Sequence, residues 1–209
     1  MNQSNTQQAN VEHSNIEHSN IEHSHTEESV TEQIGISKAY FATGCFWGAE
    51  RGFWNLPGVL HTSVGYMGGM KKEPTYKEVC TGKTGHAEAV EVEFDPAIIS
   101  YHRLLEEFWT MHDPTSLNRQ GGDIGTQYRS AIFTTSASQL RQALVTREQY
   151  NEVLMKNGLD DICTEIKSAD GIDYWPAEEY HQRYLEKNPK GYDCHSSTGV
   201  PFPKEIFIG

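Results

Sequence analysis

A cysteine lies between a glycine and two aromatic residues in the run Gly-Cys-Phe-Trp-Gly-Ala-Glu at 44–50. The apolar segment before it, residues 39–42, predicts a short strand, and residues 47–55 predict a helix. Cys45 would then lie at a strand-to-helix turn, where unpaired N–H groups and the helix dipole favour thiolate over thiol. Thiolate is the reactive form, so the motif predicts a nucleophile beside an aromatic pocket. The alternative is a cysteine buried in an aromatic core cluster.

Glu88 lies near the start of a strand that the sequence predicts over residues 87–94. Alternation places it on the same face as Val90 and Val92, opposite the two later glutamates of the strand. A carboxyl group in apolar surroundings has a raised pKa, because desolvation disfavours its charged form. Such an acid can donate a proton near neutral pH. The alternative is that Glu88, at the strand's start, reaches water.

A long polar loop is predicted over residues 114–128. Its glycines and hydrogen-bonding side chains, Asp123 among them, suit a close approach between backbone and ligand. Tyr128 lies where this loop meets the next strand, and Tyr76 follows a Pro-Thr pair. Either phenol could point into a site, although a tyrosine considered alone is more often a core or rim residue.

The three other cysteines have different surroundings. Cys194 lies in a polar segment near the C-terminus, so it could be a resolving thiol or an incidental surface residue. Cys80 and Cys163 are expected to be small buried hydrophobic residues, with Cys163 in a strand over residues 162–166. The cysteine and histidine spacings do not match those of a zinc site.

The remaining pattern predicts an α+β domain. Strands are expected over residues 59–66 and 130–134, and helices over 101–112, 138–156 and 176–187. Because clean strand–helix–strand units are few, the order favours a two-layer sandwich with a mixed sheet over a doubly wound sheet. After residue 188 the chain is expected to be irregular.

Composition limits the partners and the location. The 209 residues carry a formal net charge of −12, which argues against a nucleic-acid partner and against an anionic membrane surface. No apolar run has the length of a membrane helix, and the N-terminus lacks the pattern of a signal peptide. A cytoplasmic protein with one domain is therefore expected.

Residues 1–35 differ from the rest of the chain. A five-residue unit, Asn-Ile-Glu-His-Ser with small variations, repeats in tandem between residues 10 and 24. That period fits neither a helix nor a strand, so we predict a disordered acidic tail before a catalytic domain over 36–209. The end of this domain, 188–209, is expected to be a flexible arm. The repeated histidines could hold a metal ion loosely, but a solvated tail is the simpler interpretation.

Several segments together resemble the peptide methionine sulfoxide reductase A family. They are Gly-Cys-Phe-Trp-Gly at 44–48, Gly-Tyr-Met-Gly-Gly at 65–69, Thr-Gly-His-Ala-Glu at 84–88, Asn-Arg-Gln at 118–120, Gly-Thr-Gln-Tyr-Arg-Ser at 125–130 and Asn-Pro-Lys-Gly-Tyr at 188–192. The resemblance implies a ferredoxin-like α+β core with additional elements. It also implies reduction of methionine S-sulfoxide, free or in proteins, with thioredoxin as reductant and no cofactor. Such an enzyme repairs proteins after oxidative damage, and a monomer is expected.

The resemblance also assigns roles by motif position. Cys45 would be the nucleophile and Glu88 the proton donor. The polar site would be completed by Tyr76, Asp123 and Tyr128, and the substrate with its methyl group would be held by Gly44, Phe46 and Trp47.

Regeneration would involve a second cysteine. The resemblance implies that Cys194 attacks the sulfenic acid of Cys45, and that thioredoxin reduces the resulting disulfide. Some family members carry two C-terminal cysteines. Residues 196–203 of this chain contain none, so a single Cys45–Cys194 disulfide is expected.

Two other functions stay open. Cys45 with His86 as base would give an acyl-transfer hydrolase, which needs no reductant. A non-catalytic binder would hold a methionine side chain without any loss of thiols. For His86 the sequence favours a different role, a satisfied hydrogen-bonding residue that shapes its loop.

Overall fold

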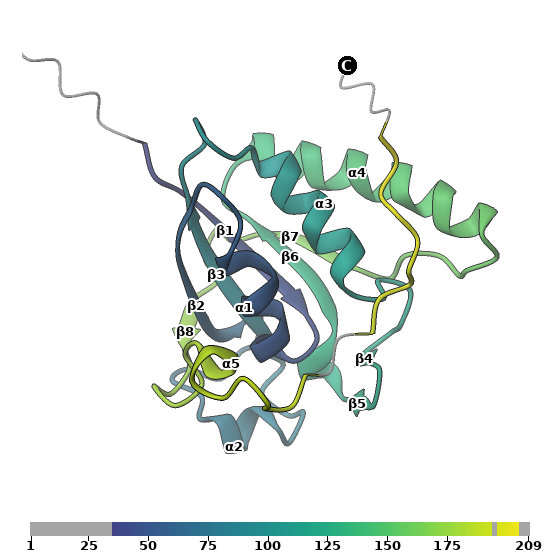
Figure 1. The fold of residues 1–209 in the computed structure, drawn as a ribbon. Coiled ribbons are helices and arrows are strands. Elements are labelled where there is room, and N and C mark those ends of the chain that lie inside the picture. Colours follow the sequence, from purple (N-terminus) through teal and green to yellow (C-terminus); the bar gives the residue numbers. More distant parts are fainter. Residues whose placement is uncertain (1–34, 194–195, 205–209) are drawn as a thin grey trace, which may run out of the picture. The chain divides into compact units, whose positions relative to one another are not determined.

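The computed structural model describes residues 35–193 and 196–204 (Figure 1). The strands are β1 (Ser37–Thr43), β2 (Val59–Met67), β3 (Ala87–Phe94), β4 (Arg119–Gln120), β5 (Asp123–Ile124), β6 (Ser130–Thr134), β7 (Glu165–Ser168) and β8 (Tyr174–Pro176). The helices are α1 (Phe46–Trp54), α2 (Tyr76–Val79), α3 (Tyr101–Met111), the 3-10 helix η1 (Thr126–Tyr128), α4 (Ala137–Lys156) and α5 (Tyr184–Lys187). The predicted tail, save its last residue, lies outside the described residues and stays a prediction.

Six strands form one mixed sheet in the order β7-β6-β1-β3-β2-β8. Neighbouring strands are antiparallel except for β6 and β7, which run parallel. The two short strands β4 and β5 pair separately. The α+β class with a mixed sheet, predicted from the order of elements, is thereby confirmed. The ferredoxin-like character of the core stays a prediction.

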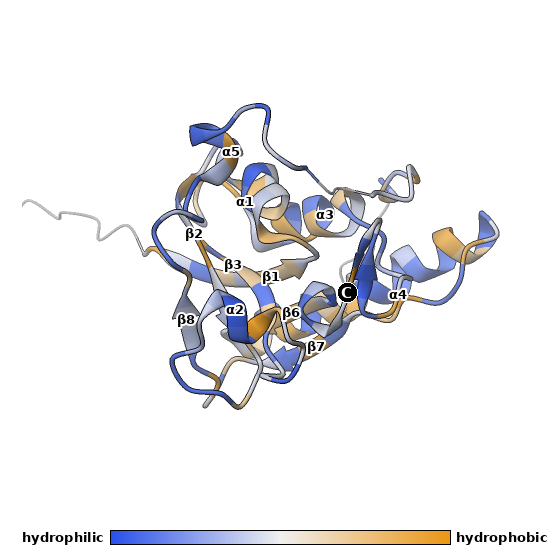
Figure 2. Cartoon of the chain, turned by 90° about the horizontal axis from the view of Figure 1, so that it is seen from below, coloured by the Kyte–Doolittle hydropathy of each residue, from blue (hydrophilic) through white to orange (hydrophobic). Residues whose placement is uncertain are grey.

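Helices α1, α3 and α4 cover one face of the sheet and bury its apolar side chains (Figure 1). Phe41 of β1 stacks on Phe53 of α1, with ring centroids 4.9 Å apart, and lies 5.4 Å from Phe108 of α3. Full burial of each such ring contributes about 1.5–3 kcal/mol. In Figure 2 α4 carries both hydrophilic and hydrophobic residues. Those that it buries, Ala143, Tyr150 and Leu154 among them, recur at the spacing of one helix face.

Strand register brings four chain segments together at one end of the strands in the middle of the sheet. Thr43, the last residue of β1, pairs with Ser130, the first residue of β6. In the neighbouring pair of strands, Tyr66 near the end of β2 lies opposite Glu88 near the start of β3. Because β1 and β3 are antiparallel, the end of β1 and the start of β3 also meet there. The turn after β1 therefore places Cys45 at the end of the sheet where β3 begins, and Glu88 is the second residue of β3.

Two predicted elements are wrong. The strand expected over 162–166 begins only at Glu165, because the N–H of Cys163 is already bonded to the carbonyl of Pro114 at 2.9 Å. The helix expected over 176–187 is reduced to α5, and Pro176 ends strand β8. The polar loop expected over 114–128 contains β4, β5 and η1.

Residues 196–204 lie against α3 and α4 (Figure 1). The Tyr150 hydroxyl of α4 donates to the carbonyl of Val200 at 2.7 Å, and its ring lies 5.4 Å from that of Phe202. This segment contains no helix or strand, as expected. In the described parts of the chain, no helix combines the length and the apolar character that crossing a membrane requires.

Candidate active site

Cys45 is the N-cap residue of α1 and is 7 % exposed. The sequence placed it at a strand-to-helix turn, and the structure confirms that position. Its side chain makes no capping hydrogen bond, but it lies at the positive end of the helix dipole. A helix dipole in this orientation favours the anionic form of a thiol, whereas burial opposes it.

Glu88 bonds the first residue of this helix. Its Oε2 accepts the backbone N–H of Phe46 at 3.0 Å, and the residue is 2 % exposed. Burial raises the pKa of Glu88 to about 8, the Phe46 hydrogen bond opposes this, and the negative charge of Asp123 adds to it. The burial of Glu88 that the strand pattern predicted is confirmed, and the raised pKa favours its neutral form near pH 7. With Oε2 accepting, a proton on this group belongs on Oε1.

Gly44 allows the polar loop to approach Cys45. It has a φ of +101°, and a Cβ at this position would lie 2.6 Å from the Cγ of Gln120. Gln120 is held in turn by Asp113, whose N–H and carbonyl bond its amide at 3.1 and 2.7 Å. The sequence motif contained Gln120 but gave it no role. Its position explains why a glycine precedes Cys45.

Three further residues assigned by the resemblance lie in the same electrostatic neighbourhood. Burial chiefly raises the pKa of Tyr76 and of Tyr128, and the charge of Glu88 contributes to both shifts. Asp123 and Cys45 also raise the pKa of Tyr128. Both phenols therefore keep their protons at neutral pH and can act as hydrogen-bond donors.

Asp123 faces the C-terminal segment as well. Its Oδ1 accepts the Tyr192 hydroxyl at 3.2 Å, while its buried Oδ2 has no hydrogen-bond partner among the described residues. Asp193, the residue after Tyr192, forms an ion pair with Arg51 of α1. Cys194 follows directly and lies outside the described residues. The two contacts bring the residues before it beside α1 and β5.

The two aromatic residues after Cys45 have different surroundings. Phe46 is buried, 5.9 Å from the ring of Tyr66 and 5.0 Å from that of His181. Trp47 is half-buried and stacks on Tyr184 at 3.7 Å. Both rings are thus fixed by residues far along the chain, which the motif alone could not reveal.

Residues 178–184, which we call the supporting turn, are the main part of the site that sequence reasoning missed. Glu178 accepts the Tyr76 N–H at 2.9 Å and the Tyr66 hydroxyl at 2.7 Å. Gln182 bonds both backbone groups of Val64, at 2.8 and 2.9 Å. The helix predicted over 176–187 rested on Pro176 at its first turn. The structure has a turn there instead, and its polar side chains bond groups of β2 and α2.

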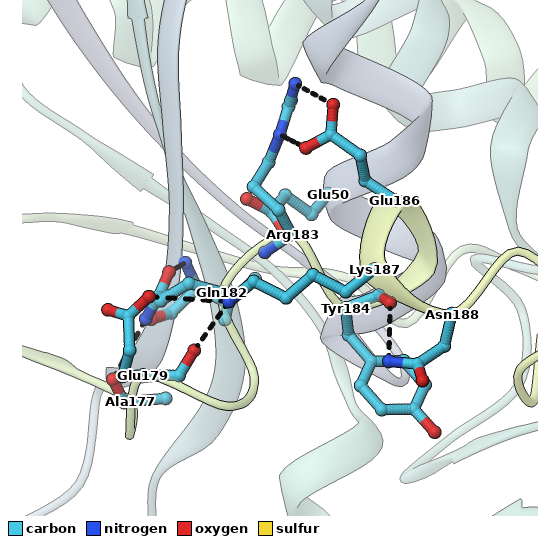
Figure 3. Close-up of polar contacts among 10 residues, drawn as sticks. Glu50, Ala177, Glu179, Gln182, Arg183, Tyr184, Glu186, Lys187 and Asn188 are labelled. Carbon is cyan, nitrogen blue, oxygen red and sulfur yellow. Dashed lines mark hydrogen bonds and ion pairs between the residues drawn. The ribbon is translucent and has the colours of Figure 1, made fainter.

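Buried Glu50 of α1 anchors the end of the supporting turn (Figure 3). It accepts the N–H of Arg183 at 2.8 Å and the Thr62 hydroxyl at 3.0 Å. Arg183 has a positive φ of 52°, so this bond holds a backbone conformation that arginine rarely adopts. Burial raises the pKa of Glu50 to about 7, against the two hydrogen bonds.

His86 is not placed to assist Cys45. Its Nδ1 accepts the Gly69 N–H at 3.1 Å, and its Nε2 lies 2.7 Å from the carbonyl of Lys71. Both ring nitrogens are therefore used by the loop after β2. This confirms the interpretation of His86 as a satisfied loop-shaping residue.

The prediction that Cys80 is buried is wrong. It is exposed at the C-cap of the four-residue helix α2, which is too short to bury it. Cys163 is half-buried, and its thiol donates to the Pro114 carbonyl at 3.2 Å. Among the described residues no group of three or more histidine, cysteine or acidic side chains is arranged to hold a metal ion.

The family pattern of peptide methionine sulfoxide reductases matches residues 37–203. This covers all the site residues described above. The chain belongs to the peptide methionine sulfoxide reductase family. It is therefore an enzyme of the oxidoreductase class that acts on methionine sulfoxide.

Individual relatives agree with this membership. The chain is 54 % identical over 169 residues to peptide methionine sulfoxide reductase MsrA of Streptomyces griseus, covering 81 % of this chain and 76 % of that protein. It is 52 % identical to the mitochondrial enzyme of Rattus norvegicus over 82 % of this chain and 73 % of that one. The structure of methionine sulfoxide reductase A of Corynebacterium diphtheriae, 45 % identical, superposes with a TM-score of 0.74 over 83 % of this chain and 85 % of that one.

Proposed function

We propose that this chain reduces methionine S-sulfoxide, free or in proteins, to methionine by way of a sulfenic acid at Cys45. The observation that carries the proposal is the hydrogen bond from Phe46 N–H to Glu88. It holds a buried carboxyl group, whose pKa is raised by burial, against the residue that follows the nucleophile. A thiolate attacks a sulfoxide only if the departing oxygen receives a proton, and Glu88 is the group that supplies it.

In the first step the Cys45 thiolate attacks the sulfoxide sulfur while Glu88 donates a proton to the oxygen. The neutral phenols of Tyr76 and Tyr128 donate hydrogen bonds to that oxygen as negative charge builds on it. The protonated oxygen then passes from the substrate sulfur to the sulfur of Cys45, and the bond between the two sulfurs breaks. Methionine leaves and Cys45 is left as a sulfenic acid. The substrate sulfur is reduced by two electrons, and the cysteine sulfur is oxidised by two.

In the second step the thiol of Cys194 attacks the sulfenic sulfur of Cys45. Water leaves and a disulfide forms, with no further change in electron count. The dithiol of thioredoxin then reduces that disulfide and is itself oxidised. The contact of Asp193 with Arg51 supports this pairing, because it holds the residue before Cys194 against the helix that Cys45 begins.

The aromatic residues after Cys45 set the substrate. Phe46 and Trp47 would hold the methyl group of the sulfoxide. Because Gly44 has no side chain, Gln120 of the polar loop can pack against the turn that carries Cys45. No cofactor is required beyond the thiol reductant. We further propose a monomer in the cytoplasm with a role in protein repair, and oxidised proteins and thioredoxin as its partners.

The test is a single turnover without added reductant. One equivalent of N-acetyl-methionine S-sulfoxide should give about one methionine product per chain, and the R epimer should give none. Cys45→Ser should release no product, while Cys163→Ser, a matched loss of one thiol outside the site, should release as much as the unmodified chain. Product from Cys45→Ser would overturn the proposal.

The same reaction separates the two alternative functions. A hydrolase would cleave a thioester or ester substrate repeatedly without reductant, but both nitrogens of His86 are already bonded to backbone groups. A non-catalytic binder would retain the sulfoxide without converting it. Release of methionine together with loss of thiols distinguishes the reductase from both.

A further inference from the structure

Glu178, in the supporting turn, joins two elements of the site through one carboxyl group. Its Oε1 accepts the backbone N–H of Tyr76, the first residue of α2, at 2.9 Å. Its Oε2 accepts the hydroxyl of Tyr66, on β2, at 2.7 Å. Glu178 is half-buried, and Tyr66 is fully buried. One side chain therefore bridges α2 and β2, and it comes from more than 100 positions later in the chain.

The helix α2 is too short to fix its own position. It has four residues, far fewer than an isolated helix needs to be stable in water. Its capping box, formed by Thr75 and Glu78, lies within the same turn, so it shapes α2 but does not place it in the fold. Val79 of α2 packs in the core, a contact that has no preferred direction. The bond to Glu178 supplies the direction.

The other end of this bridge reaches the two strands that hold the proposed acid. Tyr66 lies directly opposite Glu88 in the register of β2 and β3. Backbone hydrogen bonds keep paired strands at a fixed spacing, so the position of Tyr66 relative to Glu88 is set. In the proposed first step, Tyr76 and Glu88 act on the same sulfoxide oxygen. Their relative positions therefore matter for the rate.

The hydrogen bonds also determine the charge of Glu178. Burial opposes its ionisation, but the bonds from the Tyr76 N–H, the Tyr66 hydroxyl and its own N–H outweigh burial and lower its pKa. The group is therefore ionised at neutral pH. An ionised carboxylate accepts at both oxygens, and hydrogen bonds to a charged acceptor are stronger than those between neutral groups.

We propose that Glu178 is a positioning residue, which places the Tyr76 phenol against the sulfoxide oxygen that Glu88 protonates. The inference rests on the proposed function, because the role of Tyr76 as a donor is part of it. Tyr128 donates to the same oxygen in that mechanism, so each phenol can partly replace the other. The effect of Glu178 should therefore be largest where Tyr128 is absent.

Two phenylalanine backgrounds test whether Glu178 acts through Tyr76. In Tyr128→Phe, where Tyr76 is the remaining phenol donor, adding Glu178→Leu should lower the single-turnover rate constant at saturating sulfoxide about tenfold. In Tyr76→Phe no phenol is left for Glu178 to place, so the same change should lower it by less than about twofold. A residue that only stabilises the fold would act equally in both. Equal losses would overturn the proposal.

A conservative variant tests the hydrogen bonds separately from the charge. Glu178→Gln keeps an oxygen for the Tyr76 N–H, and its amide N–H can donate to the Tyr66 hydroxyl. In the Tyr128→Phe background this variant should therefore stay within about twofold of the background alone. A loss as large as that of Glu178→Leu would contradict the bridge.

A second variant cuts the bridge at its other end and decides the question if Glu178→Leu fails to fold. Tyr66→Phe removes the hydroxyl that Glu178 accepts and leaves Glu178 itself unchanged. It should lower the rate constant at least about threefold in Tyr128→Phe and less than about twofold in Tyr76→Phe. Equal losses in the two backgrounds would again overturn the proposal.

Glu179→Leu is the matched control, because Glu179 is the next residue of the same turn (Figure 3). Its side chain is 91 % exposed and pairs with Lys187 rather than with α2. The rate constant should stay within about twofold in both backgrounds, as expected for an exposed ion pair. A tenfold loss in this control would show that any lost charge in the turn slows the reaction, and would contradict a specific role of Glu178.

Amide hydrogen exchange keeps the bridge separate from the proposed function. With isotope-labelled tyrosine, the Tyr76 amide signal is identified by its absence in Tyr76→Phe. It should exchange at least about tenfold faster in Glu178→Leu than in the unmodified chain, and stay slow in Glu178→Gln and Glu179→Leu. An unchanged signal in Glu178→Leu would overturn the bridge.

The two failures differ in what they leave intact. If the amide signal behaves as expected but the unmodified chain reduces no sulfoxide, the proposed function fails and the bridge stands. If the unmodified chain is active and Glu178→Leu acts equally in the two phenylalanine backgrounds, the positioning role fails and the proposed function stands.

Discussion

The backbone N–H of Phe46 donates to the carboxyl group of Glu88 at 3.0 Å, which ties the start of α1 to the start of β3. Cys45 is the residue before Phe46, so the acid is bonded to the backbone of the residue next to the nucleophile. Such positioning is worth most when neither group must move before reaction. The first predictions follow from this bond.

Replacing the acid should slow the first step without preventing folding. Glu88→Gln keeps an oxygen that can accept the Phe46 N–H but cannot donate an acidic proton. We expect the rate constant of methionine release in a single turnover to fall about 10²–10⁴-fold. Glu93→Gln, on the same strand and in the ion pair with Lys38, is the matched control and should stay within about twofold. A small effect of Glu88→Gln would remove Glu88 from the mechanism.

The pH dependence of that step should report Glu88. Burial raises the pKa of Glu88 to about 8, and the acid works only in its protonated form. The rate constant should therefore decline as pH rises through about 8. The residual activity of Glu88→Gln should lack this decline. A falling limb that persists at the same pH in the variant would assign it to another group.

Glu50 should make stability depend on pH. Burial raises its pKa from 4.5 to about 7, so the folded chain holds a proton that the unfolded chain releases earlier. Its contribution to stability is then fully present below pH 4.5 and declines as pH rises to about 7, by about 3 kcal/mol at most. Glu50→Gln should remove this part of the slope in urea unfolding. Parallel slopes for the two proteins would contradict the raised pKa.

Gly44→Ala tests the close approach of the polar loop. Its φ of +101° is unfavourable for alanine, and the added Cβ would lie 2.6–2.7 Å from the Gln120 side chain. Gly171→Ala is the control, with a positive φ of 72° but nothing within 4 Å. Thermal unfolding should show a loss of about 1–2 kcal/mol for Gly171→Ala and a clearly larger one for Gly44→Ala. Single-turnover rates should fall only for Gly44→Ala.

The sequence predicted those parts of the site that depend on local pattern. Alternation along β3 identified Glu88 as an acid on an apolar face, and the strand-to-helix turn placed Cys45 at a helix start. Both inferences use neighbours within a few residues, for which the periods of strand and helix are reliable guides. The pairing of β1 with β3, which the sequence did not predict, then brings Cys45 and Glu88 to the same end of the sheet.

The supporting turn could not be predicted in this way. Its Glu178, His181 and Gln182 have helical spacing, but each bonds a group more than 100 positions away in the chain. Such contacts override local preference and leave no periodic trace. The same holds for Cys163, which a bond to the Pro114 carbonyl removes from the strand. The position of Cys194 stays a prediction, because it lies outside the described residues.

The most direct test is a count of thiols on the unfolded chain before and after one equivalent of methionine S-sulfoxide. We predict that the count falls from the four cysteines of the sequence to two, with one methionine released. Cys80→Ser and Cys163→Ser should each fall from three to one, whereas Cys194→Ser should lose only the Cys45 thiol, as a sulfenic acid. An unchanged count in the unmodified chain, or a loss of two thiols in Cys45→Ser, would contradict the mechanism.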